Sequence, residues 1–467
     1  MKITREIAEY ITSAVIEDFP PDAVYAAKGG IIDCLGCMLA GSREPLADIL
    51  CQFIKASGGE PFSLPQAQAQ DRPRATVVGK RFKTSAPEAA LVNGAMAHAL
   101  DYDDVSRPMK GHPSVVLLPP VLALGEEEGA TGQDVLLAYM VGFEVVCSIA
   151  AAMSVDYFDD LGWHPTGPLG ALGAGAAAAH LLKLDSQQTA MAISMAASQA
   201  AGLRQNFGTM TKPFHAGLAS RSGVTAARLV QAGFTASVDG LEGRFGFLRA
   251  FSGGKGYDEE KLLEGLGKIF YLVDGGIEVK KYPCCGSTHL ALDALFQLLH
   301  KERVDPSQVE DVEVLVDFDP PRSLIHYRPK TTLEGKFSMQ YCIAAALLDE
   351  KVGLGSFTDQ QVLRSEAQEL IPRVSMARNP GYQGQPSWVE GYNVVQIRLK
   401  DGRTLEQEAK RATEGPLPGI TMEELKAKFR DCASRVLPAD RIGHVLESLE
   451  RIEELDRISR LVDMVRG

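Results

Sequence analysis

The chain has 467 residues, of which 45% are hydrophobic, so it is long enough for two or three domains with real cores. Its 48 lysines and arginines against 60 aspartates and glutamates give a net charge of −12, which argues against a general binder of nucleic acid or anionic membranes. An anionic substrate would therefore need a local cationic pocket. The N-terminus turns acidic at once and lacks the apolar run of a signal peptide, and we expect a cytoplasmic protein.

The eight cysteines are scattered without the spacing of a disulfide framework, so we expect reduced and mostly buried thiols. Residues 139–153 are the most apolar stretch, but they carry Glu144 and are too short to cross a bilayer. Cys34 and Cys37 have zinc-knuckle spacing within a helical pattern that offers no second pair of ligands. We therefore expect neither a membrane span nor a metal site there.

Apolar residues recur at three- and four-residue spacing before residue 265, and this period predicts helices. The predicted helices are 4–17, 22–40, 86–101, 132–153, 167–182, 186–201 and 216–232. Three pairs have the spacing of a capping box or a looser variant of one: Ser85 with Glu88, Thr131 with Asp134, and Asp185 with Gln188. Residues 170–179 are almost all alanine and glycine, which lets helix axes approach closely.

The pattern changes after residue 265, where a smaller α+β segment is expected. It contains a strand at 309–318, a hairpin of 393–399 and 404–409, and helices at 288–303 and 338–350. Asp401-Gly402 between the hairpin strands has the composition of a tight turn. Helical periodicity returns between 421 and 465, and periodicity alone leaves open whether this tail packs on the first helices.

Two glycine-rich stretches match phosphate-binding loops only in part. Residues 173–178 fit a loose dinucleotide fingerprint but follow no predicted strand. Residues 253–256 lack both the upstream glycine and the Ser or Thr of a phosphate loop. We therefore expect no nucleotide cofactor.

Three aspartates within 101–104 crowd the end of the predicted helix 86–101, where the helix dipole disfavours anions. Either water solvates these carboxylates, or cationic groups meet them. The nearest cationic candidates in the sequence are His112, Arg107 and Lys110.

Three ionisable residues each precede a proline close to a glycine: His112, His164 and Lys212. Proline biases the preceding residue toward extended geometry, so each side chain is expected to extend from non-helical backbone at a helix start. Histidines can transfer protons near neutral pH, an aspartate such as Asp101 can orient one of them, and lysine can hold a carboxylate. The set predicts proton abstraction beside a carboxylate or carbonyl, followed by elimination, decarboxylation or reprotonation.

Cys284 and Cys285 lie in a polar loop that follows Lys280 and Lys281. Lysines that are near in space lower the pKa of a thiol and make it reactive. The alternative, which we favour, is a loop that lines the substrate site with unreactive thiols.

Five segments together resemble the signature blocks of the 2-methylcitrate dehydratase family, also called the MmgE/PrpD family. They are residues 98–104, 111–114, 162–167, 211–217 and 281–285. The resemblance runs in order from about residue 5 to at least residue 350. The family also includes cis-aconitate decarboxylase and iminodisuccinate epimerase.

The resemblance implies a mainly α fold in which residues 1–265 plus 410–467 form a large all-helical domain and 266–409 form an inserted α+β lid domain. It also implies a homodimer that acts, without cofactor or metal, on a small di- or tricarboxylate in a cleft between the domains. The implied catalytic residues are Asp101, His112, His164 and Lys212. The implied substrate-binding residues are Lys280, Cys285, His289 and Tyr341.

Some positions differ from individual branches of the family. The decarboxylase branch carries His where Cys285 stands and Thr where Val105 stands, which argues against decarboxylation of cis-aconitate. The dehydratase branch carries Asn where Asp103 stands. We expect a hydro-lyase that removes water from a hydroxy acid such as 2-methylcitrate. The alternatives are an epimerase of a dicarboxylate, a cis-aconitate-type decarboxylase, and a small-acid binding protein without catalysis.

Overall fold

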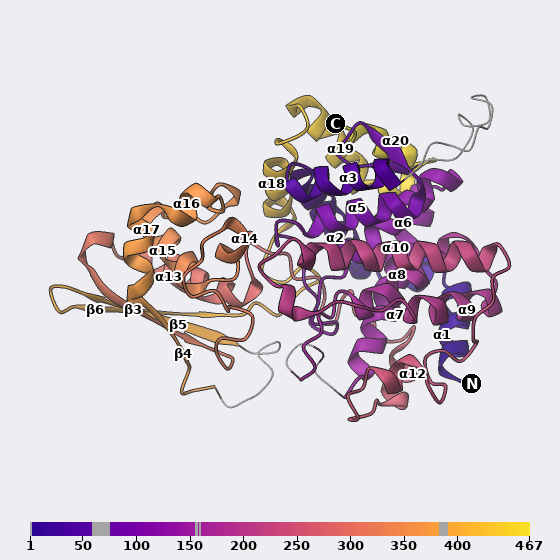
Figure 1. The fold of residues 1–467 in the computed structure, drawn as a ribbon, viewed down its shortest axis with the longest axis horizontal. Helices are drawn as coiled ribbons and strands as arrows, with labels where there is room; N and C mark the ends of the chain where they lie inside the picture. The colour runs from indigo at the N-terminus through magenta and orange to yellow at the C-terminus, as the bar shows by residue number, and fades with distance from the viewer. Residues whose placement is uncertain (1, 58–74, 155–156, 158–159, 383–390) are drawn as a thin grey trace.

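The computed structural model describes residues 2–57, 75–154, 157, 160–382 and 391–467, which form a larger and a smaller body (Figure 1). Buried apolar side chains of residues 3–279 and 417–465 share one hydrophobic core. A second core gathers side chains of 284–409, together with Phe207 from the larger body. The expectation of a mainly α protein is confirmed.

The larger body is helical, with one short hairpin. Its helices are α1 (Ile3–Ser13), α2 (Pro21–Gly41), α3 (Pro45–Ser57), α5 (Ala86–His98), α6 (Ser114–Glu128), α7 (Gly132–Ala152), α8 (Pro168–Leu181), α9 (Ser186–Ala197), α10 (Thr211–Gln231), α11 (Phe247–Ala250), α12 (Glu259–Gly265), α18 (Met422–Ala433), α19 (Ala439–Glu450) and α20 (Ser459–Met464). The hairpin pairs β1 (Ala75–Val77) with β2 (Phe82–Thr84).

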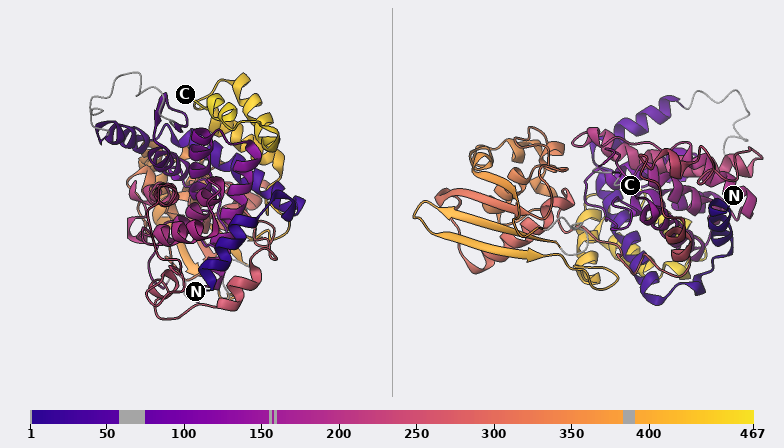
Figure 2. Two further views of the ribbon diagram at one scale, coloured as in Figure 1. Left: turned by 90° about the vertical axis from the view of Figure 1, so that its right-hand side faces the viewer. Right: turned by 90° about the horizontal axis from the view of Figure 1, so that it is seen from below.

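Helix α5 lies at the centre of the larger body and packs against α2, α6 and α10. Nearly all of its residues are buried, and a helix that is apolar on every side is stable only in such a place. The C-terminal helices, yellow in Figure 2, return to the early helices, and α18 packs on α2. The tail that periodicity left unplaced therefore belongs to the first core.

Two helices, α2 and α7, are long and apolar enough to cross a membrane by length and composition alone. In each, 83% of the most apolar window is buried inside the protein, as expected for core helices. The sequence argument counted only residues 139–153 and judged them too short to cross a bilayer. The apolar helix α7 has 21 residues, so its length does not exclude a membrane span. Burial, rather than length, argues against a membrane span.

The smaller body is a four-stranded sheet with helices on one face (Figure 1). Its strands are β3 (Val309–Val316), β4 (Val374–Arg378), β5 (Tyr392–Leu399) and β6 (Thr404–Lys410), and its helices are α13 (His289–Lys301), α14 (Thr332–Gly335), α15 (Met339–Asp349), α16 (Asp359–Leu363) and α17 (Ser365–Leu370). The strand order is β4-β3-β5-β6, with β4 parallel to β3 and the other pairs antiparallel. The predicted strand and hairpin are confirmed, and Gly402 in the turn has a φ of +89°.

The boundary between the two hydrophobic cores lies later in the chain than residue 265. Leu272, Ile277 and Val279 still belong to the larger core, whereas Cys284 belongs to the smaller one. At the other end, Ala409 is the last member of the smaller core. Two segments therefore join the bodies: the first is the connection that carries Lys280, and the second is residues 410–416.

Two local expectations differ from the structure. Capping boxes are present at Thr131 and Asp185, but the Ser85 side chain makes no capping hydrogen bond. Glu88 pairs instead with Arg221 at 2.8 Å, which removes the second half of the box. Helix α6 was not predicted because Pro119 and Pro120 lie inside it, and prolines there usually end a helix.

The glycine and alanine surfaces of α8 and α10 allow close contact between these helices. A Cβ atom added at Gly223 of α10 would lie 2.4 Å from the backbone carbonyl carbon of Ala174 in α8. Backbone cannot rotate away as a side chain can, so the helices would have to separate.

We expect Gly223→Ala to lower the free energy of unfolding by about 1–3 kcal/mol, measured by urea denaturation, because it overpacks this contact. Gly443 is the control: it lies exposed in α19 with no atom within 4 Å of the added Cβ. Gly443→Ala should stabilise the protein by about 0.5–1 kcal/mol through helix propensity. Equal effects of the two substitutions would contradict the packing argument.

Candidate active site

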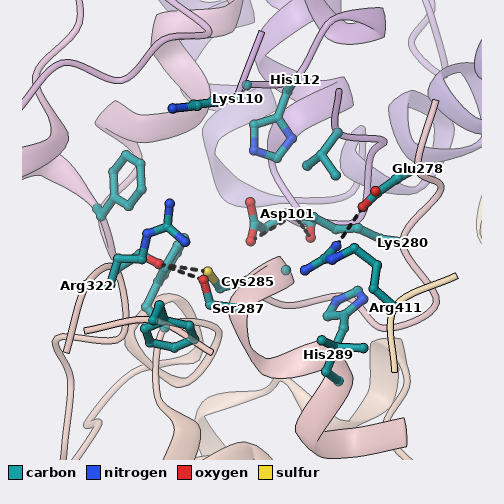
Figure 3. Close-up of a pocket in the computed structure, with 18 of the residues that line it drawn as sticks. Asp101, Lys110, His112, Glu278, Lys280, Cys285, Ser287, His289, Arg322 and Arg411 are labelled. Atoms are coloured by element: carbon teal, nitrogen blue, oxygen red, sulfur yellow. Dashed lines mark hydrogen bonds and ion pairs between the residues drawn. The ribbon is translucent and has the colours of Figure 1, made fainter. Parts of the chain in front are cut away.

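A pocket lies between the two bodies, and residues from both line it (Figure 3). It encloses roughly 1000 Å³ of space, part of which is open to solvent. The larger body and the connecting segment contribute Asp101, Val105, Lys110, Gly111, His112, His164, Phe207, Lys212, Glu278, Val279 and Lys280. The smaller body and the chain just after it contribute Cys285, Gly286, Ser287, His289, Leu290, Asp317, Phe318, Arg322, Ser323, Phe337, Asn393 and Arg411.

The loop after α5 holds Asp101 in a strained backbone conformation. Asp101 has a φ of +51°, in the left-handed region that non-glycine residues seldom adopt. Three buried lysines donate to three consecutive carbonyls of this loop: Lys336 to Leu100 at 2.8 Å, Lys280 to Asp101 at 2.9 Å, and Lys428 to Tyr102 at 2.6 Å. These hydrogen bonds hold the carboxylate of Asp101 in the pocket wall.

The carboxylate of Asp101 lies between two ammonium groups. Lys212 Nζ is 2.5 Å from Oδ1, and Lys280 Nζ is 3.1 Å from Oδ2. Burial would raise the pKa of Asp101, but the two lysines hold that pKa well below its usual range. Burial lowers the pKa of Lys212, although Asp101 partly opposes it. Burial acts on Lys280 too, but there Asp101 prevails and the pKa is raised.

A second aspartate, Asp103, orients the histidines. Its carboxylate is 2.9 Å from His98 Nδ1 and 2.8 Å from His112 Nδ1. Since a carboxylate accepts, both Nδ1 atoms carry the hydrogen. The expectation that Asp101 orients a histidine is therefore wrong, because Asp101 is occupied by the two lysines.

His98 links the carboxylate of Asp103 to the ammonium group of Lys212. Its Nε2 lies 2.8 Å from Lys212 Nζ, so it accepts a hydrogen bond while Nδ1 donates to Asp103. Burial lowers the pKa of His98 to about 3, which keeps the ring neutral as these hydrogen bonds require. Burial also lowers the pKa of His112. His112 therefore presents an unprotonated Nε2, while its Nδ1 donates to the carbonyl of Asp104 at 3.0 Å and lies 2.8 Å from the Asp103 carboxylate.

His164 lies on another side of the same pocket. Its Nδ1 is 3.2 Å from Nδ1 of His215, and its buried Nε2 has no hydrogen-bond partner among the described residues. Burial, with Lys212 nearby, holds the pKa of His164 well below its usual range. A buried ring nitrogen without a partner is costly unless a ligand meets it, so His164 is a second group suited to proton transfer.

Charged residues of the lining carry an excess of positive charge. Lys110, Lys212, Lys280, Arg322 and Arg411 face Asp101, Glu278 and Asp317, a formal charge of +2. Burial raises the pKa of Asp317 from its ordinary value, and Arg411 partly opposes this shift. In a chain of net charge −12, this is the local cationic pocket that an anionic substrate needs.

By distance alone, His98, His112 and His164 could hold a metal ion, as could His98 with Asp101, Asp103 and His112. However, His98 already uses both ring nitrogens, one on Asp103 and one on Lys212. The ammonium groups beside these side chains repel cations. The arrangement suits an anion better than a metal ion.

The structure brings seven of the eight predicted site residues into the pocket lining. Tyr341 is the exception: it is fully buried in the smaller body, where its hydroxyl donates to the carbonyl of Ser356. Cys285 Sγ lies 3.2 Å from Ser323 Oγ, and His289 Nε2 lies 3.3 Å from the carbonyl of Cys284. Backbone geometry is as predicted at His112 and His164, but Lys212 lies within the first turn of α10.

The sequence-based site omitted His98 and Asp103, although both lie in the aspartate-rich segment that was singled out. His98 begins the signature segment 98–104, but nothing in the sequence indicates its contact with Lys212. Arg322 and Arg411 lie in no motif, and only the fold brings them to the pocket.

Two family models match the chain: the MmgE/PrpD N-terminal domain over residues 5–260 and the MmgE/PrpD C-terminal domain over residues 282–451. The chain belongs to the MmgE/PrpD family. This confirms the resemblance found in the five signature segments.

Curated relatives are similar over nearly their whole length. A cis-aconitate decarboxylase from Aspergillus terreus is 27% identical over 489 residues, which cover 99% of this chain and 96% of the relative. The cis-aconitate decarboxylase from Mus musculus is 28% identical over 475 residues (100% and 93%), and that from Homo sapiens is 27% identical over 473 residues (100% and 95%). These relatives support an enzyme of the lyase class. They favour the decarboxylase alternative over a dehydratase.

The neutral state of buried His98 predicts a pH-dependent stability. Its folded pKa, about 3, lies below the unfolded value of about 6.5, so acid protonates the unfolded chain first. This contribution is complete above the unfolded pKa and is lost as the pH falls. We expect urea denaturation to show that the advantage of the wild type over His98→Gln shrinks by about 2 kcal/mol between pH 7 and pH 5. A pH-independent difference would contradict a neutral His98.

Proposed function

We propose that this member of the MmgE/PrpD family is a cofactor-independent decarboxylase of an unsaturated tricarboxylate such as cis-aconitate. One observation carries the proposal. Two neutral histidines, His112 and His164, line the same pocket as the ammonium groups of Lys212 and Lys280. The names of the relatives support the choice of decarboxylation among lyase reactions.

In this reaction the bond between a carboxymethyl carbon and its carboxylate breaks, and carbon dioxide leaves. The electron pair of that bond forms a new double bond, the old double bond shifts, and its far carbon takes up a proton. Negative charge develops beside the remaining carboxylates during this shift. Lys212 and Lys280, fixed by Asp101, lie where they can stabilise that charge without reorganising.

The proton comes from a histidine in this proposal. The lowered pKa of His112 keeps Nε2 unprotonated before substrate binds, and a bound trianion favours the protonated form. Asp103 would stabilise the imidazolium that results, because its negative carboxylate lies 2.8 Å from Nδ1. His164 is the second candidate donor from the other side of the pocket.

We expect the carboxylate that leaves as carbon dioxide to lie against the apolar part of the pocket lining. Val105, Phe207, Val279, Leu290, Phe318 and Phe337 line the pocket together with the charged groups. A carboxylate placed against such side chains loses hydration, and its conversion to neutral carbon dioxide relieves that cost. Phe207 and Phe337 have ring centroids 5.4 Å apart and lie about 5 Å from Lys212 Nζ.

A dehydratase of a 2-methylcitrate-like hydroxy acid is the second candidate. Hydrogen bonds link Cys285, Ser323 and Ser287, and all three residues line the pocket. Such a group of hydroxyls and a thiol favours a substrate that carries a hydroxyl group. Cys285 also occupies the position where the decarboxylase branch is expected to carry His.

The family resemblance also supports three further properties, which concern domain arrangement, oligomeric state and location. The smaller body would act as a lid over the pocket, the protein would function as a homodimer, and it would work in the cytoplasm. Each is a proposal of its own, and the reaction at the pocket does not depend on them.

We expect chelator-treated protein in deuterated water to release carbon dioxide from cis-aconitate and to place one deuterium in the product, read by mass spectrometry. The panel should include citrate, 2-methylcitrate and amino dicarboxylates. Loss of water from 2-methylcitrate would instead identify a hydro-lyase, and deuterium uptake without loss of mass would identify an epimerase. Binding without turnover across the panel would leave only a binding protein. Near-normal turnover by both His112→Ala and His164→Ala would refute the assigned proton donors.

We expect Asp103→Asn to lower kcat on the order of 100- to 10,000-fold, because the carboxylate that orients and stabilises His112 is lost. Asp48→Asn serves as the control, since Asp48 makes only a surface ion pair with Lys80. Far-ultraviolet circular dichroism should be unchanged in both variants. A kcat within a few-fold of the wild type for Asp103→Asn would exclude Asp103 from this role.

A further inference from the structure

Backbone hydrogen bonds hold the segment that carries His164. Trp163 pairs with Leu203 across a short antiparallel bridge, and the N–H of His164 donates to the carbonyl of Gly202 at 3.0 Å. The carbonyl of His164 accepts from the N–H of Gly167 at 2.9 Å, just before α8 begins. The backbone from which the His164 ring extends is therefore fixed on both sides.

His215 reaches the His164 ring from helix α10. Its Nδ1 lies 3.2 Å from Nδ1 of His164, and the two ring centroids are 5.5 Å apart. Lys212 is three positions earlier in α10, so both side chains extend from one face of the first turns of that helix. One helix face thus supplies an ammonium group to Asp101 and a ring nitrogen to His164.

Close packing fixes the His215 ring in turn. Only 5% of His215 is exposed. A Cβ atom added at Gly202 would lie 3.3 Å from Cγ of His215, so the ring packs against backbone there. Helix α10 itself contacts α5 closely, since a Cβ atom added at Gly217 would lie 2.2 Å from the carbonyl oxygen of Leu91. Packing therefore maintains the contact between the two Nδ1 atoms.

The two rings share one hydrogen between their Nδ1 atoms. Burial lowers the pKa of His215 to about 4 and holds the pKa of His164 well below its usual range, so both rings are neutral at pH 7. A neutral imidazole has one N–H and one acceptor nitrogen, so one ring donates and the other accepts. With Nδ1 engaged by His215, Nε2 of His164 is the nitrogen that remains for a ligand in the pocket.

The surroundings of His164 oppose a second proton on its ring. Burial lowers its pKa most, and four basic groups lower it further: Lys212, His98, His112 and His215. The ring centroids of His98 and His112 lie 5.5 and 6.0 Å from that of His164. Asp101 and Asp103 are each paired with other groups, namely the two lysines and the two other histidines.

His112 has the opposite kind of partner. The carboxylate of Asp103 lies 2.8 Å from its Nδ1, and an anion at that distance favours the imidazolium. His215 brings no negative charge to His164. A carboxylate can only accept from Nδ1, whereas a neutral ring such as His215 can donate or accept.

We propose that His215 is a positioning residue for His164, whose Nδ1 it engages as a neutral partner, so that Nε2 is held for the substrate and stays a weaker base than Nε2 of His112. The pocket then contains two proton sites of different strength, which is what separate acid and base roles require. The inference rests on the proposed function only in placing the substrate beside His164.

Three substitutions at position 215 separate shape from charge. Asn and Asp have the same shape and place a polar atom near the position of Nδ1, whereas Leu places a methyl group there. The test is a nuclear magnetic resonance titration of protein with isotope-labelled histidine rings and no substrate, in which the His164 signal is the one that His164→Gln removes. His164 should remain neutral at pH 6 in the wild type and in His215→Asn. His215→Asp should raise the pKa of His164 by at least about 1 relative to His215→Asn, because an anion then lies beside Nδ1.

Turnover gives a second readout. His215→Leu should lower kcat on the order of 10- to 100-fold, because a reacting group displaced by about 1 Å can lose that much. His215→Asn should recover most of the loss, since its amide restores the hydrogen bond. His180→Leu is the matched control: Nδ1 of this half-buried histidine donates to the carbonyl of Ile11 at 2.6 Å, and His180 does not line the pocket. It should change neither kcat nor the titration of His164.

Each failure has its own signature. If His164 titrates alike in His215→Asp and His215→Asn, or if His215→Leu keeps the kcat of the wild type, the positioning role is refuted while the proposed reaction stands. If His215→Asn is as slow as His215→Leu, His215 acts through packing alone and the inference is equally refuted. If the titrations are as expected but cis-aconitate is not decarboxylated, the proposed function fails, and the role of His215 stands for the substrate that the panel identifies.

Discussion

The active-site loop depends on the burial of three ammonium groups. Each lysine donates to one of three consecutive carbonyls, and the three come from distant parts of the chain: Lys280 from the connection, Lys336 from the smaller body, and Lys428 from α18. A buried charge that loses its partner is strongly destabilising. Lys428 also pairs with Asp33 at 2.6 Å, and Lys336 also donates to the carbonyl of Pro283 at 2.9 Å. The loop carbonyls complete the hydrogen bonding of these buried groups, and these contacts hold Asp101 in its left-handed conformation.

This constraint explains how a cluster of ionisable groups survives in a nearly dry interior. Asp101 is balanced by two lysines, and Asp103 by two ring N–H donors, so each carboxylate keeps its charge. The histidines stay neutral because burial disfavours their protonated forms. Aspartates that would destabilise an exposed helix end are therefore accommodated at the centre of the buried cluster.

Much of the fold follows from local patterns, and the rest depends on long-range contacts. Helical and alternating periods located most elements, but β4 pairs in parallel with β3 across more than fifty residues and left no local mark. Signature segments located His112, His164 and Lys212, yet spacing cannot tell which aspartate faces which partner. Asp101 and Asp103 are two positions apart, and only the packed rotamers separate their roles. Tyr341 shows the converse error, since closeness in a motif did not bring it to the pocket.

The two walls of the pocket belong to different hydrophobic cores, and side chains such as Phe207 and Lys336 cross between them. His112, His164 and Lys212 all belong to the larger body, whereas Arg322 belongs to the smaller one. Under the proposed function, the spacing of the two bodies would therefore limit the length of the substrate. Substitutions near the connection, far from any reacting atom, can retune that spacing, so a chain of this design can change its substrate while its chemistry stays intact.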